Sequence, residues 1–220
     1  RIQVIHRGVD GRAYPHGWKP DPIWQQAFFT QFPQAAGKRL VTLPRRITRL
    51  KGHEDFIELI ARLKRRGLPV HGLIVGGAAA SKQRHLQKLC YRVRSMGLEA
   101  DISFTGQRDD LKNILAISNL VLSLSTQPES FGRTTLEVLR LGVATAGYDR
   151  GGVGEILHAV YPAGLLPRGD LGAATQCIAT MLQQPSPVPD DDFYPLRSML
   201  SQTLDLYKQL ARAPRRQGNQ

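Results

Sequence analysis

The stretch QPESFGRTTLEVLRLG, residues 127–142, contains the clearest structural signal in this chain of 220 residues. It follows the apolar run LVLSLS and contains Pro128, which blocks continuation of a strand, and Gly132, which permits a tight turn. The segment RTTLEVLRL then has the apolar spacing of a helix. The order strand, turn, helix exposes a helix N-terminus at the carboxyl end of a strand, as in open α/β sheets.

The rest of the chain repeats this alternation of short apolar runs and longer segments of helical period. Strands are predicted at RLVTLP, LPVHGLIVGG, ADISFTG, LVLSLS and VATAGY, with a short edge strand at AGLLP. Helices are predicted at GHEDFIELIARLKRRG, SKQRHLQKLCYRVRSMG, RDDLKNILAIS, RTTLEVLRL, GGVGEILHAV, DLGAATQCIATMLQQ and FYPLRSMLSQTLDLYKQLA. This alternation predicts βαβ units and a parallel sheet of the α/β class, without revealing the order of its strands.

The net charge of +12 is spread unevenly. Residues 1–100 contain 19 Lys and Arg against 6 Asp and Glu, whereas residues 101–220 contain 11 against 12. An acidic partner is therefore expected near the first half, and a phosphate-rich ligand, an anionic membrane surface and nucleic acid all fit. No apolar run approaches the roughly 20 residues of a membrane span. Cys90 and Cys177 lack metal-ligand spacing and are interpreted as packing thiols in a reducing compartment.

Two acids flank the glycine turn. The free N–H groups of the first helical turn attract phosphate oxygens, and Thr134 and Thr135 add hydroxyl donors. Glu137 lies three residues beyond Thr134, where a carboxylate can accept hydrogen bonds from both hydroxyls of a ribose. Glu129 lies before the turn and can bind hydroxyls of a sugar ring. The spacing fits a molecule with ribose, diphosphate and hexose in a row, but it equally fits a surface glutamate on an amphipathic helix.

Other predicted strand ends carry suitable groups. Arg46 and Lys51, in PRRITRLKGHEDF, can clamp a diphosphate as two cations. Gly106, Gln107 and Arg108 follow another strand, where backbone groups can contact the edge of a base. Each loop taken alone also fits an ordinary solvated loop.

A further loop, DRGGVGEIL, places Gly151 and Gly152 between a strand and a helix. Glycines at such a position permit a close approach of the backbone to a ligand. Because parallel strands end on one side of a sheet, we expect all these loops to converge on one crevice.

These motifs resemble the C-terminal, donor-binding domain of a GT-B-fold retaining glycosyltransferase of the large family four, also called glycosyl transferases group one. The resemblance covers roughly residues 2–185. It rests on VIHRGVD, RITRLKGH, VGG, ISFTGQRDDL, PESFGRTTLE and GGVGEIL. Two departures stand out: Arg45 occupies a position that is usually glycine, and LGVATAGYD lacks a common proline. The resemblance implies a Rossmann-like, doubly wound parallel sheet, the C-terminal half of a GT-B enzyme.

On this basis the chain divides into four parts. Residues 1–39 are predicted to be the inter-domain connection, beginning with the strand-like run IQVI and ending in an aromatic helix packed on the domain. Residues 40–185 form the nucleotide-sugar-binding domain, residues 186–212 a C-terminal helix, and residues 213–220 a disordered tail. Because the chain begins at Arg1 and not at methionine, we expect an N-terminal acceptor domain that is missing from it.

The resemblance also implies residue roles. Arg46, Lys51 and Glu129 are the predicted catalytic residues: the two cations offset negative charge on the departing diphosphate, and Glu129 holds the transferred sugar. The predicted donor-binding residues are Gly106, Gln107, Arg108, Ser130, Phe131, Gly132, Arg133, Thr134, Thr135 and Glu137. No metal or other cofactor is expected, and the DDD run at residues 190–192 is interpreted as a solvated turn. His53 is interpreted as a partner of nearby carboxylates.

The implied activity is hexosyl transfer, with retention, from a UDP-, GDP- or ADP-linked sugar to a cell-envelope glycan or lipid-linked acceptor. The expected partners are the nucleotide sugar, the missing acceptor domain and an anionic membrane surface, but no nucleic acid. The implied activity and partners predict a cytoplasmic location, on the inner face of the membrane. The fragment alone is expected to be inactive. Alternatives are a basic membrane- or nucleic-acid-binding module, suggested by KQRHLQKLCYRVR at residues 82–94, and a GT-B nucleotide-sugar isomerase.

Overall fold

The computed structural model describes residues 2–212. Six parallel strands form one sheet in the order β3-β2-β1-β4-β5-β6. Their bounds are β1 Arg39–Pro44, β2 Val70–Val75, β3 Ile102–Gly106, β4 Leu120–Ser123, β5 Thr145–Tyr148 and β6 Leu165–Leu166. The strand order reverses between β1 and β4, which confirms the predicted doubly wound, Rossmann-like sheet. The two-residue β6 lies at the edge, as predicted.

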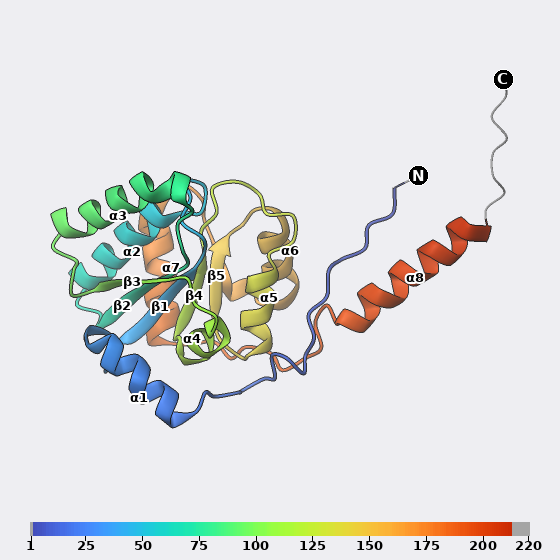
Figure 1. Cartoon of the computed structure of the whole chain (residues 1–220), viewed down its shortest axis with the longest axis horizontal. Coiled ribbons are helices and arrows are strands. Elements are labelled where there is room, and N and C mark those ends of the chain that lie inside the picture. The colour runs from blue at the N-terminus through green and yellow to red at the C-terminus, as the bar shows by residue number, and fades with distance from the viewer. Residues whose placement is uncertain (1, 213–220) are drawn as a thin grey trace, which may run out of the picture.

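Within residues 2–212, eight α-helices surround and extend this sheet. Their bounds are α1 Pro22–Gln31, α2 His53–Arg65, α3 Gln83–Ser95, α4 Leu111–Ile117, α5 Arg133–Arg140, α6 Gly151–Val160, α7 Leu171–Gln183 and α8 Leu196–Arg212. Side chains of β1 point alternately to two faces. Val41 and Leu43 belong to the same buried cluster as Phe56 of α2, whereas Leu40 clusters with Phe28 of α1. Figure 1 shows α2 and α3 on one side of the sheet and α1 and α4 on the other.

The two ends of the described chain correct two predictions. The run IQVI is not a strand: residues 2–8 have no regular structure, and Ile2 and Val4 are 94% and 71% exposed. A strand needs a neighbouring strand, and here only Val9 pairs, through a bridge to Pro195. The C-terminal helix, predicted at residues 193–211, is confirmed at Leu196–Arg212, but residues 186–195, which the predicted division also assigned to it, precede the helix. The predicted disordered tail lies outside the described residues.

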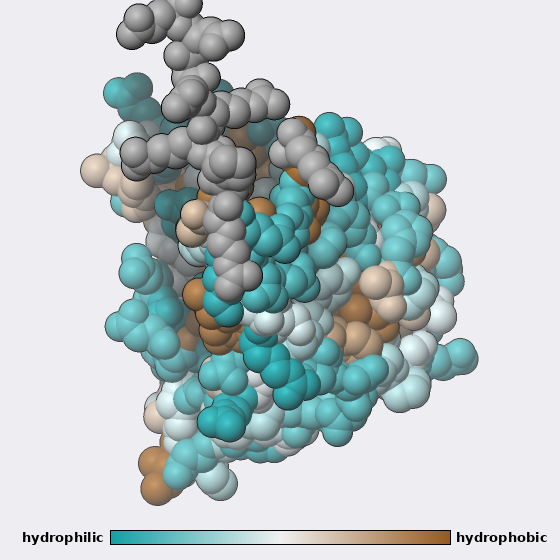
Figure 2. Space-filling model, turned by 90° about the vertical axis from the view of Figure 1, so that its right-hand side faces the viewer, coloured by the Kyte–Doolittle hydropathy of each residue, from teal (hydrophilic) through white to brown (hydrophobic). Residues whose placement is uncertain are grey.

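The segment before Val9 and helix α8 project together from the sheet domain (Figure 1). Helix α8 exposes large apolar side chains, namely Leu200, Leu204, Tyr207 and Leu210. Figure 2 views the molecule from this side and shows a mainly hydrophilic surface interrupted by separate hydrophobic patches. No helix among residues 2–212 is both long and apolar enough to cross a membrane.

Helix α3 packs on the sheet through a narrower face than the sequence predicts. Leu89 and Val93 are buried, four residues apart on one face. Cys90 is exposed, and Cys177 on α7 is half-buried. One residue advances a helix by about 100°, so Cys90 turns out of the face centred on Leu89. The interpretation of Cys90 as a packing thiol is therefore wrong.

His71, on β2, links stability to pH. It is fully buried, its Nε2 lies 2.9 Å from Ser103 Oγ, and burial followed by the charge of Lys38 lowers its pKa to about 4. The unfolded chain takes up the proton first, so the contribution of His71 is complete above pH 6.5 and is lost as the pH falls towards 4. Over this range we expect the free energy of unfolding to fall by at most about 3 kcal/mol through His71.

Urea unfolding of the wild type and of His71→Leu across the same pH range measures this effect. The variant should show a clearly shallower dependence on pH. An unchanged slope in the variant would assign the effect to other groups.

Candidate functional site

A cavity of about 620 Å³ opens at the carboxyl ends of β1 and β4, where the strand order reverses. Two loops, residues 44–51 and 125–134, and the side chain of Arg7 supply its lining. We call this space the switch-point cavity. In open α/β sheets, ligands bind at this place, because the loops on either side of the reversal run apart and leave a crevice.

Positive charge dominates the switch-point cavity. Glu129 is the one acid of its lining, against five cations: Arg7, Arg45, Arg46, Lys51 and Arg133. The first turn of α5 also reaches the cavity, through Arg133 and Thr134, and the free N–H groups of a helix N-terminus attract anions. The arrangement therefore favours an anionic ligand.

Glu129 is held by three donors. Its Oε1 accepts from Lys51 Nζ at 2.7 Å and from Ser125 Oγ at 2.6 Å, and its Oε2 accepts from Arg45 Nη2 at 3.2 Å. Burial would raise the pKa of Glu129, but the charge of Arg45 and the contacts with Lys51 and Ser125 outweigh burial, so the pKa lies below its usual value. Glu129 is therefore a fixed anion at neutral pH.

Arg45 lines the cavity, although sequence reasoning assigned it no binding role. Its side chain is only 10% exposed, and its Nη2 also donates to Ser123 Oγ at 2.8 Å. Burial lowers its pKa, while the charge of Glu129 opposes this shift. The signal in the sequence was an arginine at a usual glycine position. Its partner could not be read from that signal, because Glu129 lies 84 residues further along the chain.

Two glycines bring the cavity loops together. Gly52 caps α2 with φ +73°. A β-carbon at Gly52 would overlap the carbonyl oxygen of Leu124, the residue after β4. Gly132 caps α5 with φ +84° and packs on Val153 of α6. Both backbone angles strongly favour glycine.

Gly151 and Gly152 pack α6 against the loop that carries Glu129. Neither lines the switch-point cavity. The N–H of Gly152 donates to the carbonyl of Glu129 at 2.8 Å, and a β-carbon at Gly152 would overlap the backbone of Phe131. These glycines let α6 support the loop of residues 128–131, and so they help to position Glu129.

Most of the predicted site residues meet in the switch-point cavity. Those that line it are Arg46, Lys51, Glu129, Ser130, Phe131, Gly132, Arg133 and Thr134. Gly106, Gln107 and Arg108 do not, because β3 lies two strands away from β1. Arg108 instead donates to both carboxylate oxygens of Asp110, at 2.8 and 2.6 Å. A role of these three residues in donor binding stays a prediction.

Thr135 and Glu137 lie one turn into α5, behind the cavity wall. Glu137 is 7% exposed, so it is not the surface residue that its spacing also allowed. Its Oε1 accepts from Arg133 Nε at 2.8 Å, and burial, followed by the charge and hydrogen bond of Glu137, raises the pKa of Tyr14. The buried hydroxyl of Thr135 has no hydrogen-bond partner among residues 2–212. A role of either residue in donor binding stays a prediction.

His53 is buried beneath the loop of residues 44–51. It is fully inaccessible, and burial lowers its pKa while the backbone carbonyls of Arg45 and Thr48 and the charge of Glu54 oppose the shift. His53 therefore supports the loop in its neutral form. Neither ring nitrogen has a hydrogen-bond partner among residues 2–212, so the interpretation as a partner of nearby carboxylates is wrong.

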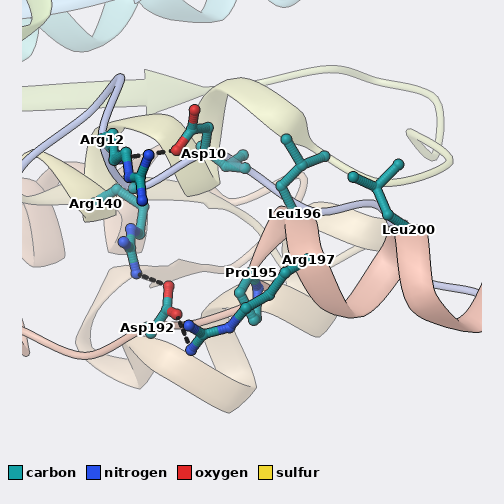
Figure 3. Close-up of a pocket in the computed structure, with 10 residues that line it drawn as sticks. Asp10, Arg12, Arg140, Asp192, Pro195, Leu196, Arg197 and Leu200 are labelled. Atoms are coloured by element: carbon teal, nitrogen blue, oxygen red, sulfur yellow. Dashed lines mark hydrogen bonds and ion pairs between the residues drawn. The ribbon is translucent and has the colours of Figure 1, made fainter.

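The DDD run forms an exposed turn that fastens α8. Asp192 accepts from Arg140 Nη1 at 2.7 Å and from Arg197 Nη2 at 2.8 Å, beside a separate cavity of about 440 Å³ (Figure 3). Within the described part of the chain, no group of three or more His, Cys, Asp or Glu side chains is arranged to hold a metal ion.

An open parallel sheet with a cationic cavity at its reversal point defines an α/β domain suited to an anionic ligand. Residues 25–191 match the sequence model of the family Glycosyl transferases group 1. The chain belongs to this family.

Curated relatives are similar over part of their length. The 2-deoxystreptamine N-acetyl-D-glucosaminyltransferase of Streptomyces fradiae is 29% identical over 143 residues, covering 64% of this chain and 33% of the relative. The D-inositol 3-phosphate glycosyltransferase of Rhodococcus erythropolis is 29% identical over 158 residues, covering 70% and 34%. The chain thus spans about a third of the length of these relatives.

Solved structures share the fold. Anabaena Alr3699/HepE, in complex with UDP and glucose, superimposes with a TM-score of 0.81 at 24% identity, covering 94% of this chain and 57% of that one. The C-terminal domain of the group 1 glycosyl transferase LpcC from Francisella tularensis gives 0.65 at 19% identity, covering 91% and 98%. The architecture is that of GT-B glycosyltransferases, as the motifs imply.

Proposed function

We propose that this chain is the donor-binding domain of a glycosyltransferase and holds a nucleoside-diphosphate sugar in the switch-point cavity. The observation that carries the proposal is the meeting of five cations and a helix N-terminus around one oriented carboxylate, at the reversal point of the sheet. The similar Anabaena protein was captured with UDP and glucose and with UDP-glucose, which supports this class of ligand.

The roles follow from charge and contact. Arg46 is exposed and makes no ion pair within residues 2–212, so it is free to bind a phosphate oxygen. Lys51, already fixed by Glu129, lies beside it as a second cation. Negative charge that develops on the leaving diphosphate is stabilised by such preplaced cations without a metal. Glu129 has acceptor capacity left on Oε2 for a hydroxyl of the sugar.

The complete enzyme would transfer the sugar, with retention, to a cell-envelope glycan or lipid-linked acceptor at the cytoplasmic face of the membrane. An acceptor domain would pack against the segment before Val9 and the apolar side chains of α8, which no other described residues cover. The donor half alone lacks the acceptor site, so we expect it to bind donor and to transfer nothing.

Calorimetry with UDP, GDP, ADP and their sugars tests donor binding. One nucleotide should bind, and Arg46→Ala and Lys51→Ala should each weaken binding by about tenfold or more, because each removes a charge-assisted contact. Lys208→Ala, on α8 and away from the cavity, is the control and should leave binding unchanged. Absence of heat with every nucleotide, in protein that unfolds cooperatively, would contradict the proposal.

The alternative of a basic interfacial module meets an obstacle in α3. An interfacial helix places its apolar face in the membrane, but Leu89 and Val93 of α3 are buried against the sheet. A nucleotide-sugar isomerase would use the same cavity and differ only in needing no acceptor.

A further inference from the structure

A separate cavity, of about 410 Å³, lies between the loop that follows β1, the first turn of α2 and one face of α3. We call it the α3 cavity. Its lining includes Arg49, Glu54, His85, Lys88 and Arg92. It shares no lining residue with the switch-point cavity. Its volume is in the range of about 300–1,000 Å³ that is usual for small-molecule sites.

Uncompensated positive charge borders the α3 cavity. Arg49, Lys88 and Arg92 make no ion pair with any described side chain, and Glu54 is the one acid of the lining. Elsewhere on the same helix, Arg94 is paired with Glu99 at 3.2 Å. The three cations are therefore available to an anion, whereas Glu54 can only accept hydrogen bonds at neutral pH.

His85 adds a buried polar atom without a partner. The residue is 8% exposed, and its Nε2 has no hydrogen-bond partner among residues 2–212. Glu54 Oε1 lies 3.8 Å from Nε2, beyond hydrogen-bond distance. Buried polar atoms in native proteins nearly always have a partner. A ligand in the cavity would supply one.

We propose that the α3 cavity binds a phosphate monoester that carries at least one hydroxyl group. Arg49, Lys88 and Arg92 would bind the phosphate oxygens, and Glu54 would accept a hydrogen bond from the hydroxyl. The acid disfavours a ligand that presents anionic groups on every side. Inorganic phosphate has its P–OH donors only on the group that the cations bind, whereas the ester carries a separate hydroxyl for Glu54.

The site adjoins the loop that carries the proposed donor contacts. Arg49 lies between Arg46 and Lys51 in the sequence, and Lys51 is bonded to Glu129. A ligand that fixes Arg49 restrains this loop, so it changes the affinity for the nucleotide, and the nucleotide changes its affinity by the same factor. This coupling rests on the proposed function, whereas the α3 site itself does not.

Calorimetry of the 220-residue chain with sn-glycerol 3-phosphate, inorganic phosphate and glycerol tests the site. Glycerol phosphate should bind about tenfold more tightly than inorganic phosphate, and glycerol should not bind. The double variant Lys88→Gln/Arg92→Gln should lose at least about tenfold in affinity for glycerol phosphate, since two of the three proposed phosphate contacts are removed. The matched control, Lys82→Gln/Arg84→Gln, removes the same charge from exposed positions outside the lining and should change little.

Two outcomes with the variants would overturn the proposal. Equal losses in the two double variants would show that only net charge matters. Loss of glycerol phosphate binding in Arg46→Ala would place the ligand in the switch-point cavity. Binding of glycerol phosphate without any binding of nucleotides would contradict the proposed function and leave the α3 site intact.

The same chemistry can come from a soluble metabolite or from a lipid headgroup, and vesicles separate the two. Retention on phosphatidylcholine vesicles that contain phosphatidylinositol 4-phosphate, whose headgroup carries a phosphate monoester and free hydroxyls, would identify a lipid ligand if it is lost in Lys88→Gln/Arg92→Gln. Glycerol phosphate binding without retention on those vesicles would identify a soluble one. Either result supports the site. Absence of both glycerol phosphate binding and vesicle retention would refute the site.

Discussion

Glu129→Gln is expected to lower the free energy of unfolding by about 3 kcal/mol, because it leaves Arg45 buried without a counter-charge. The guanidinium of Arg45 is only 10% exposed and has one other side-chain partner, Ser123. Lys51 is 31% exposed, so water compensates it more easily. Because the pKa of Glu129 is depressed in the folded state, its contribution is present above its ordinary pKa and is lost as the pH falls through the folded value.

Denaturant unfolding at neutral pH measures the effect of Glu129→Gln. Glu99→Gln is the matched control, since it breaks an exposed ion pair with Arg94 and should cost at most about 1 kcal/mol. Combining Arg45→Met with Glu129→Gln removes both charges and should recover most of the loss. Equal losses in the free energy of unfolding for Glu129→Gln and Glu99→Gln would show that Arg45 and Glu129 do not form a buried ion pair.

Gly152→Ala is expected to destabilise the domain by about 3 kcal/mol or more, although alanine is the better helix former by about 1 kcal/mol. A β-carbon there would overlap backbone atoms of Phe131, which cannot move aside as a flexible side chain can. Relief requires the loop of residues 128–131 to shift, which breaks the hydrogen bond from Gly152 to the carbonyl of Glu129. Nucleotide affinity should fall together with stability.

Gly172→Ala gives the matched control for this helical glycine. Gly172 lies in the first turn of α7, and the nearest atom to a β-carbon there is Asp170 Oδ1 at 3.2 Å. The change should be neutral or stabilise by up to about 1 kcal/mol. Thermal unfolding of Gly152→Ala and Gly172→Ala measures both effects. A stabilised Gly152→Ala would mean that α6 does not pack closely on the Phe131 backbone.

Local patterns in the sequence are sufficient to predict the helices and strands of the fold. Each strand of a parallel sheet covered on both faces is a short apolar run, and each covering helix repeats its apolar residues every three or four positions. Both patterns span fewer than about 20 residues, so they can be read directly. The turn at Gly132 and the basic loop at Arg46 and Lys51 can be predicted from the local sequence in the same way.

Contacts between distant parts of the chain required the tertiary structure. The strand order places the loop of Gly106, Gln107 and Arg108 two strands away from β1, although it looks equivalent to the other loops in the sequence. The pairing of Arg45 with Glu129 joins residues 84 positions apart. Such pairs depend on which strands lie side by side and on which glycines let loops approach. Residue spacing along the chain predicts neither the strand order nor the close approach of loops, because both are properties of the packed sheet.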